Sequence, residues 1–160
     1  MNVDQLSGLV QQLQEDPGQG DTVWRAEVNW KDGFANQVHT RDLAPVQFDE
    51  PTQLGGTDTA PNPVEQLIGS LGSCLAIGYT ANASVRGITV RDLHIELEGH
   101  IDLPVFLGLK PGNAGYPSVN VRVYLDAAAL DELHQHVLRT SPVGNTITKP
   151  VEINAELVQR

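Results

Sequence analysis

One long apolar stretch constrains the fold of this chain more than any other part of it. Between Asn62 and Gly87, apolar and small residues recur at helical spacing, at Val64, Leu67, Ile68, Leu71, Leu75 and Gly78. Asn62 can cap a helix that begins at Pro63, and Gly87 supplies a stop. Because Glu65 is its only charged residue before Arg86, a helix here must be largely buried. Its small residues would let another helix or a sheet approach closely.

The same stretch holds the only cysteine of the chain, Cys74. A single cysteine excludes an internal disulfide framework and a thiolate zinc cluster. On an apolar helix, a cysteine is more often a small hydrophobic residue than a nucleophile. Cys74 also lies about three turns into the helix, where the helix dipole contributes little. The residues alone therefore favour Cys74 as a small hydrophobic residue of the helix over Cys74 as a nucleophile.

The remaining pattern predicts an α+β protein. A length of 160 residues suits a single domain, 1–160, with a sizeable core. The first half of the chain predicts an amphipathic helix at 3–14 in an N-terminal extension (1–20), strands at 22–30, 34–40 and 43–50 with a hairpin turn at 31–33, and the helix at 63–86. The second half predicts strands at 88–103 and 118–126, a helix at 127–139, a break at 140–150 and a strand at 151–158. The helix at 127–139 would turn Leu130, Leu133, Val137 and Leu138 toward the core. We interpret this order as a sheet wrapped around helices.

Charge and hydropathy exclude several classes of function. The formal net charge of −10 argues against binding nucleic acid or an anionic membrane surface, both of which need clustered Lys and Arg. The chain has no apolar run long enough to span a membrane. Its first residues lack the basic start and cleavage site of a signal peptide, so we expect a cytoplasmic protein. We expect no cofactor.

The candidate metal ligands have a simpler interpretation. His94, Glu96, Glu98 and His100 alternate along one predicted strand and share a face. Neighbouring side chains on such a face are about 7 Å apart, too far for all four to reach one ion at bond lengths of about 2 Å. A solvated sheet face is therefore favoured. His134 and His136 are two residues apart on a predicted helix, so their side chains diverge. The segment "LGGTDT" predicts only a turn. The chain has neither a G-x-S-x-G turn nor a glycine-rich phosphate loop.

Three segments resemble the OsmC/Ohr family (osmotically inducible protein C and organic hydroperoxide resistance proteins). They are "LGGTDTAPNPVEQLIGSLGSCLA", "GITVRDLHIELEGHIDL" and "SPVGNTITKPVEI", in the order found in that family, within a matching core of about 22–158. The resemblance implies an intertwined homodimer in which the cysteine helices are buried at the centre. It also implies a peroxidatic cysteine that attacks an organic hydroperoxide, and a second cysteine that then forms a disulfide with it.

Only part of the family's site is present. Cys74 matches the peroxidatic cysteine, and Ser141 of "TSPVGN" stands where the second cysteine belongs. In the family an arginine and a glutamate position the thiolate. Val64 occupies the usual position of that glutamate, ten residues before the cysteine, although Glu65 follows it. The family's R-D-G hairpin reads "KDG" here, so Lys31 keeps the positive charge but loses the planar guanidinium. Arg25 or Arg41 could replace the missing arginine.

Two functions follow from this resemblance. The first is a one-cysteine peroxidase for small organic hydroperoxides, in which Cys74 is the nucleophile, Lys31 supplies charge and Ser141 a hydrogen bond to the sulfur. Because serine forms no disulfide, an external thiol would have to reduce oxidised Cys74. The second is a non-catalytic homodimer that binds a small hydrophobic ligand at the subunit interface or senses oxidation through Cys74.

Overall fold

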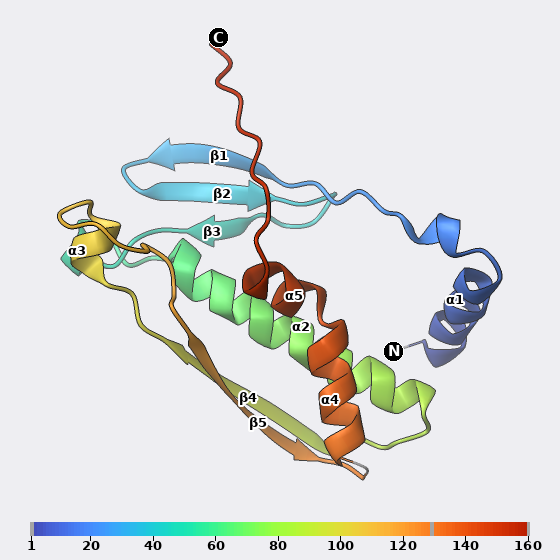
Figure 1. Ribbon diagram of the computed structural model, residues 1–160. Helices are drawn as coiled ribbons and strands as arrows, with labels where there is room; N and C mark the ends of the chain where they lie inside the picture. Colours follow the sequence, from blue (N-terminus) through green and yellow to red (C-terminus); the bar gives the residue numbers. More distant parts are fainter. Residues whose placement is uncertain (1, 129, 160) are drawn as a thin grey trace. The chain divides into compact units, whose positions relative to one another are not determined.

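The computed structural model of the protein describes residues 2–128 and 130–159 (Figure 1). The chain divides into two compact units. The first comprises Met1–Gly69 and Glu98–Val119, and the second comprises Ser70–Leu97 and Asn120–Arg160. Both contain helix and strand, and the strands of the three-stranded sheet pair antiparallel, so the predicted α+β class is confirmed. None of the described helices is long and apolar enough to cross a membrane.

The first unit begins with a helix and a three-stranded sheet. Helix α1 spans Val3–Glu15, as predicted, and is followed by the 3-10 turn η1, Pro17–Gly20. Strands β1 (Glu27–Asp32), β2 (Ala35–His39) and β3 (Val46–Phe48) form an antiparallel meander in that order (Figure 1).

The prediction for the first hairpin was wrong in detail. Residues 22–26 lie outside β1, and Lys31 and Asp32 lie in the strand rather than in the turn. The pairing shifts between Trp30 and Asp32, so the strand reaches further than the turn-forming sequence "KDG" suggests. Gly33 makes the turn at a φ of +52°, a backbone region that glycine adopts without strain.

A buried carboxylate organises the loop after β3, which the sequence predicted only as a turn. Asp49 is 2% exposed. Its Oδ2 accepts hydrogen bonds from the backbone N–H and the hydroxyl of Thr57 and from those of Thr59. The Thr57 hydroxyl is the main cause that holds the pKa of Asp49 well below its usual range. Gly56 is required here, because a Cβ would lie 1.8 Å from the backbone oxygen of Glu50.

Helix α2, Pro63–Val85, confirms the central prediction and continues from the first unit into the second. Asn62 and Glu65 form a capping box: Glu65 N–H donates to Asn62 Oδ1 and Asn62 N–H donates to Glu65 Oε2, both at 2.9 Å. At the other end, Ile88 N–H donates to the Ala83 carbonyl and Gly87 has a φ of +68°. These are the features of a glycine-terminated helix.

A short helix and a loop complete the first unit. Helix α3 spans Leu103–Phe106 and η2 spans Thr52–Leu54. In the loop after α3, the Tyr116 hydroxyl donates to the Val64 carbonyl at 3.0 Å, which ties this loop to the first turn of α2. Gly99 leaves space for the Tyr116 ring, since a Cβ at this position would lie 2.6 Å from it.

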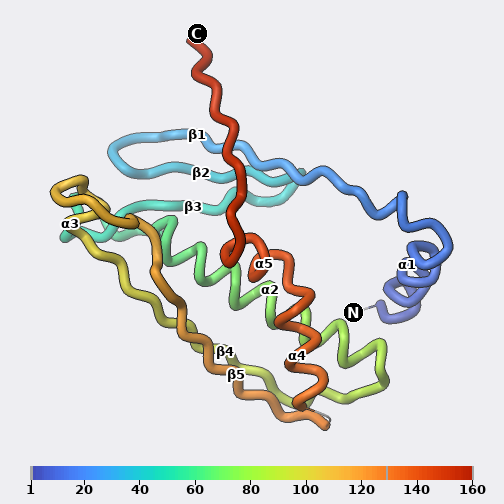
Figure 2. Tube along the Cα trace, in the orientation of Figure 1, coloured from blue at the N-terminus to red at the C-terminus, as the bar shows by residue number. Residues whose placement is uncertain are grey.

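Strands β4, Asp92–Gly99, and β5, Val119–Asp126, form a two-stranded sheet (Figure 2), and β4 is shorter than the predicted strand at 88–103. Arg91 and Asp126 join the start of β4 to the end of β5 by an ion pair and a backbone hydrogen bond. Along β4 the side chains alternate between half-buried and exposed. His94, Glu96, Glu98 and His100 are all on the exposed side, which confirms the solvated face. No cluster of three or more His, Cys, Asp or Glu side chains suited to a metal ion occurs within residues 2–128 and 130–159.

The predicted helix at 127–139 and the break after it need three corrections. Helix α4, Leu130–Thr140, buries Leu133 and Val137, but Leu130 and Leu138 are exposed. The predicted helix start at 127–128 lies outside α4, and residue 129 lies outside the described residues. The predicted break at 140–150 contains a further helix, α5, Pro142–Thr148.

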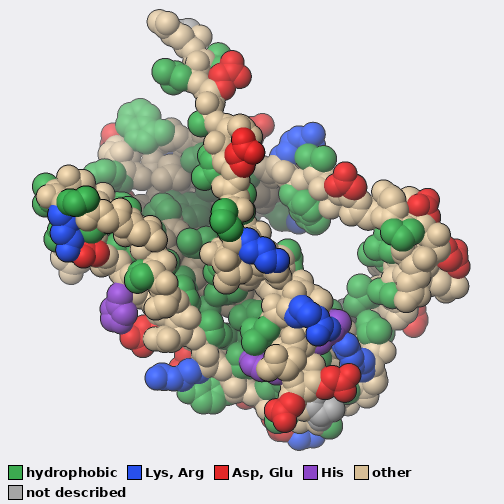
Figure 3. Space-filling view, in the orientation of Figure 1, with side chains coloured by type: hydrophobic (Ala, Val, Ile, Leu, Met, Phe, Trp, Pro, Cys, Tyr) green, Lys and Arg blue, Asp and Glu red, His purple; other side chains and the backbone are tan. Residues whose placement is uncertain are grey.

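The predicted strand at 151–158 is not formed. The segment is extended and exposed, and it pairs with no strand in the described part of the chain. A strand needs a neighbour for its backbone hydrogen bonds, however well its side chains alternate. Figure 3 shows hydrophobic side chains along this segment, and Ile153 is 86% exposed.

We predict that Asp49 makes the protein sensitive to acid. Because folding lowers its pKa, its contribution to stability is complete well above its unfolded pKa of about 3.9 and is lost as the pH falls below that value. Asp49→Asn should therefore destabilise the protein at pH 7, and the difference from the parent should shrink between pH 6 and pH 3. Urea unfolding at several pH values measures this. Asp58→Asn, in the same loop, is the control, and parallel curves for parent and Asp49→Asn would contradict the prediction.

Candidate functional site

The site lies within the second unit, where one stripe of α2 packs against α4 and α5. Gly78 faces Val137 so closely that a Cβ would lie 2.9 Å from Val137 Cγ1. One turn earlier on α2, Cys74 meets Ser141, and Leu71 lies beside Gly144. The positions on α2 fall by three and four residues while those on α4 and α5 rise, so α2 runs antiparallel to them.

Cys74 and Ser141 are in direct contact. Their Sγ and Oγ atoms are 3.2 Å apart, although the residues are separated by 67 positions in the sequence. Cys74 is half-buried and Ser141 is 5% exposed. The site therefore offers a partly accessible thiol whose nearest polar neighbour is shielded from water.

Ser141 is held in place by its role at the start of α5. It is the N-cap of that helix, and its Oγ accepts the backbone N–H of Gly144 at 3.1 Å. Because the Gly144 N–H uses a lone pair of the hydroxyl oxygen, the hydroxyl hydrogen remains to donate to the sulfur of Cys74. A hydrogen bond donated to a thiolate favours the charged, nucleophilic form over the thiol.

A hydrogen-bonded pair further along the same packing joins α2 to α4. The Tyr79 hydroxyl lies 2.5 Å from His134 Nδ1, and the two rings stack with centroids 6.1 Å apart. Tyr79 is 0% exposed, and this burial raises its pKa. His136, in contrast, contacts Arg139, which confirms that the two histidines diverge. Sequence reasoning missed the Tyr79–His134 pair, although a tyrosine in an otherwise apolar helix needs a polar partner.

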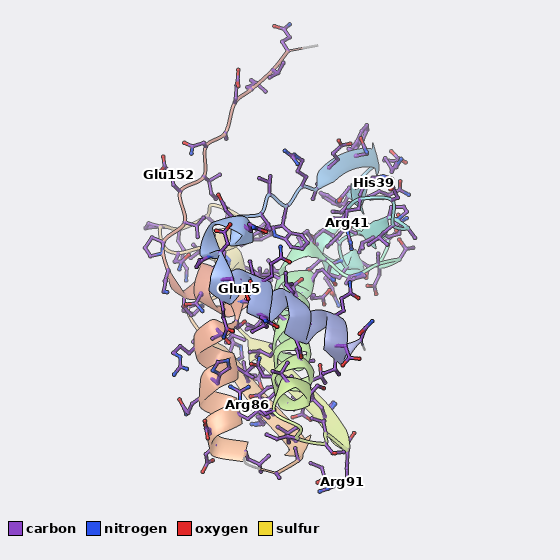
Figure 4. All side chains as sticks on the ribbon, turned by 90° about the vertical axis from the view of Figure 1, so that its right-hand side faces the viewer. Glu15, His39, Arg41, Arg86, Arg91 and Glu152 are labelled. Carbon is purple, nitrogen blue, oxygen red and sulfur yellow. The ribbon has the colours of Figure 1, made fainter. Side chains whose placement is uncertain are left out.

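The other predicted site residues have different surroundings. Lys31 is exposed in β1 and belongs to the first unit. The Glu65 carboxylate takes part in the capping box of α2, and the Val64 carbonyl accepts a hydrogen bond from the Tyr116 hydroxyl. Arg25 and Arg41 are both exposed, and Figure 4 shows Arg41 close to His39 at the end of β2. Of the predicted set, the structure brings Cys74 and Ser141 together.

Gly144 is a part of the site that sequence analysis did not single out. It supplies the N–H that orients Ser141, and its lack of a side chain leaves room for Ser141, because a Cβ there would lie 3.1 Å from the Ser141 Oγ. The pattern Ser141-Pro142, followed by Gly144, was available as an indication. A serine before a proline predicts a helix N-cap as well as the Asn62-Pro63 pair does.

Comparison with known proteins identifies the family. The family model described as OsmC-like protein matches residues 56–156. No curated protein matches the chain in sequence.

Solved structures share the fold at low sequence identity. An OsmC-like protein from Mycoplasma pneumoniae has a TM-score of 0.67 and 17% identity, covering 80% of this chain and 89% of its own. An organic hydroperoxide resistance protein OsmC from Legionella pneumophila has a TM-score of 0.56 and 20% identity, covering 79% and 91%. One from Elizabethkingia anophelis, with thiocyanate bound, has a TM-score of 0.55 and 14% identity, covering 78% and 89%.

The family match covers the apolar helix, its cysteine and the segment that carries Ser141. Both residues of the 3.2 Å contact therefore lie inside the matched region. This chain belongs to the OsmC-like protein family.

Proposed function

We propose that the protein is a one-cysteine peroxidase that reduces small organic hydroperoxides, with Cys74 as the nucleophile and an external thiol as the reductant. The observation that supports this most is the contact between Cys74 Sγ and Ser141 Oγ. It joins a half-buried thiol to an oriented hydroxyl, within a fold shared with organic hydroperoxide resistance proteins.

The proposed reaction begins with the Cys74 thiolate. Its sulfur attacks one oxygen of the peroxide bond, so that an S–O bond forms and the O–O bond breaks. The sulfur is oxidised by two electrons to a sulfenic acid, and the leaving alkoxide takes up a proton to become an alcohol. Ser141 donates a hydrogen bond to the sulfur before the attack and keeps the thiolate in place.

The return to the thiolate needs thiols from outside the chain. The sequence has no second cysteine. An external thiol attacks the sulfenic sulfur, which forms a mixed disulfide and releases water. A second external thiol then attacks the reductant's sulfur in the mixed disulfide, so that the two external thiols form a disulfide and Cys74 leaves as the thiolate. In this scheme Ser141 positions the sulfur and takes no part in electron transfer.

Lys31 and Glu65 have separate parts in the proposal. Lys31 would bring positive charge toward the Cys74 thiolate. Glu65 would act through the start of α2, since its carboxylate accepts the N–H of Asn62 and so fixes the first turn of the helix that carries Cys74. Arg25 and Arg41 are the alternative sources of positive charge.

We also propose that the working form is a homodimer. Helix α2 leaves Ile77 65% exposed, and β1 leaves Trp30 71% exposed. We expect a second copy of the chain to cover exposed apolar side chains such as these. The extended segment at 151–158 has the alternation of a strand, and an antiparallel or parallel neighbour from a second copy would satisfy its backbone.

The alternative function remains a binding protein without catalysis. A homodimer of this kind would bind a small hydrophobic ligand at its interface, and Cys74 would line that site or report oxidation. Peroxide turnover separates the two proposals, because only the first consumes hydroperoxide at the expense of a thiol.

The Ser141→Cys variant tests the proposed reaction. Since the side chains already meet, we predict a disulfide between Cys74 and the new cysteine after treatment with an organic hydroperoxide, and faster turnover with dihydrolipoamide than in the parent. Non-reducing peptide mass spectrometry and a peroxide assay measure these. Thr140→Cys, an exposed neighbour, is the control. If parent and variant both leave the peroxide untouched, the binding function holds instead.

The charge of Lys31 is tested by alkylation. If Lys31 stabilises the thiolate, Lys31→Ala should slow the reaction of Cys74 with iodoacetamide at neutral pH by about tenfold or more, whereas Lys31→Arg should retain most of the rate. Equal rates in the parent and in Lys31→Ala would show that Lys31 is only a solvated strand residue.

The homodimer is tested by mass in solution. Light scattering at micromolar concentration should return twice the chain mass of 17.3 kDa. Replacing Ile153 with Asp should shift the population toward the monomer, because it places a charge on an apolar surface that we expect to be covered, while Glu152→Gln should leave the dimer intact. A parent protein at the monomer mass would overturn this part of the proposal.

A further inference from the structure

Ser141 lies where two helices meet. Its N–H donates to the Val137 carbonyl and so ends α4, while its carbonyl accepts the N–H of Asn145 and so begins α5. Its Oγ reaches Cys74 from this bend. The position of the Ser141 hydroxyl therefore depends on the angle between the axes of α4 and α5.

Asn145 bridges the two sides of this bend. Its Nδ2 donates to the Arg139 carbonyl, in the last turn of α4, at 3.0 Å, and to the Ser141 carbonyl at 2.8 Å. Its Oδ1 accepts a hydrogen bond from the Lys149 ammonium group at 2.8 Å, which fixes the orientation of the amide. The Arg139 carbonyl lies in the last turn of α4, where carbonyls lack helical partners, so this bond satisfies a group that the bend leaves free.

We propose that Asn145 is a positioning residue that holds the Ser141 hydroxyl against Cys74. It touches neither the sulfur nor the proposed substrate and acts only through Ser141. Other polar side chains of α5, such as Thr146, bond within the helix: the Thr146 hydroxyl donates to the Pro142 carbonyl and leaves the junction untouched. As a role in the reaction this rests on the proposed function, but the contact can be tested on the thiol alone.

The test is a double-mutant cycle on Cys74 alkylation by iodoacetamide at neutral pH, in the full chain. Asn145→Leu keeps much of the side-chain volume and removes the hydrogen bonds, and Asn145→Ala checks that the result does not depend on leucine. We expect either variant to react about three- to tenfold more slowly than the parent, as expected for loss of the net contribution of one typical hydrogen bond. In a Ser141→Ala background, neither substitution should change the rate further.

Thr146→Ala is the matched control, because it removes a side-chain hydrogen bond from the same helix without loosening the junction. It should leave the alkylation rate unchanged. Circular dichroism at the assay temperature shows that each variant is folded. Equal slowing with and without Ser141, or a rate that stays at the parent value in both Asn145 variants, would overturn the proposal. If the cycle behaves as expected and the parent consumes no peroxide, the proposed function fails while the role of Asn145 stands.

Discussion

The close approach of α2 to its neighbours is the constraint on which the second unit depends. Gly72 lies so near Leu97 of β4, and Gly78 so near Val137 of α4, that a Cβ at either position would collide with the facing side chain. With no side chain at these positions, the backbones can approach until Cys74 and Ser141 touch. The Tyr79–His134 pair and the Ser141 cap then fix the register of this packing. The thiol environment is thus a consequence of helix packing, because glycine leaves the space that the contact needs.

The sequence predicted those elements whose ends are marked by local chemistry. The cap at Asn62, with Pro63 after it, and the glycine stop at Gly87 located α2, and alternation located β4 and β5. The same chemistry at Ser141 and Pro142 marks the start of α5, but the segment was interpreted only as a break in the preceding helix. At 151–158 the alternation was real, yet no strand formed, because alternation specifies which side chains share a face and not which backbone lies alongside.

The candidate site was predicted only through the family resemblance. Periodicity alone favoured Cys74 as a buried filler, and no local pattern relates it to a serine that is 67 positions away. The structure supplies the distance and the Gly144 N–H that orients the hydroxyl. With serine in place of a second thiol, the contact can orient the sulfur but cannot supply the electrons that reduce its sulfenic acid, which moves the reducing half of the proposed cycle to an external thiol. Lys31, in an exposed strand of the other unit, stays a prediction.

Trapping of the oxidised sulfur tests the central claim, that Cys74 beside Ser141 is a reactive thiol, most directly. The parent protein is treated with substoichiometric cumene hydroperoxide in the presence of dimedone, and the peptide that contains Cys74 is analysed by mass spectrometry. The account predicts a dimedone adduct on Cys74, in proportion to the peroxide added and reduced in the Ser141→Ala variant. A Cys74 that remains a free thiol while the peroxide persists would contradict it.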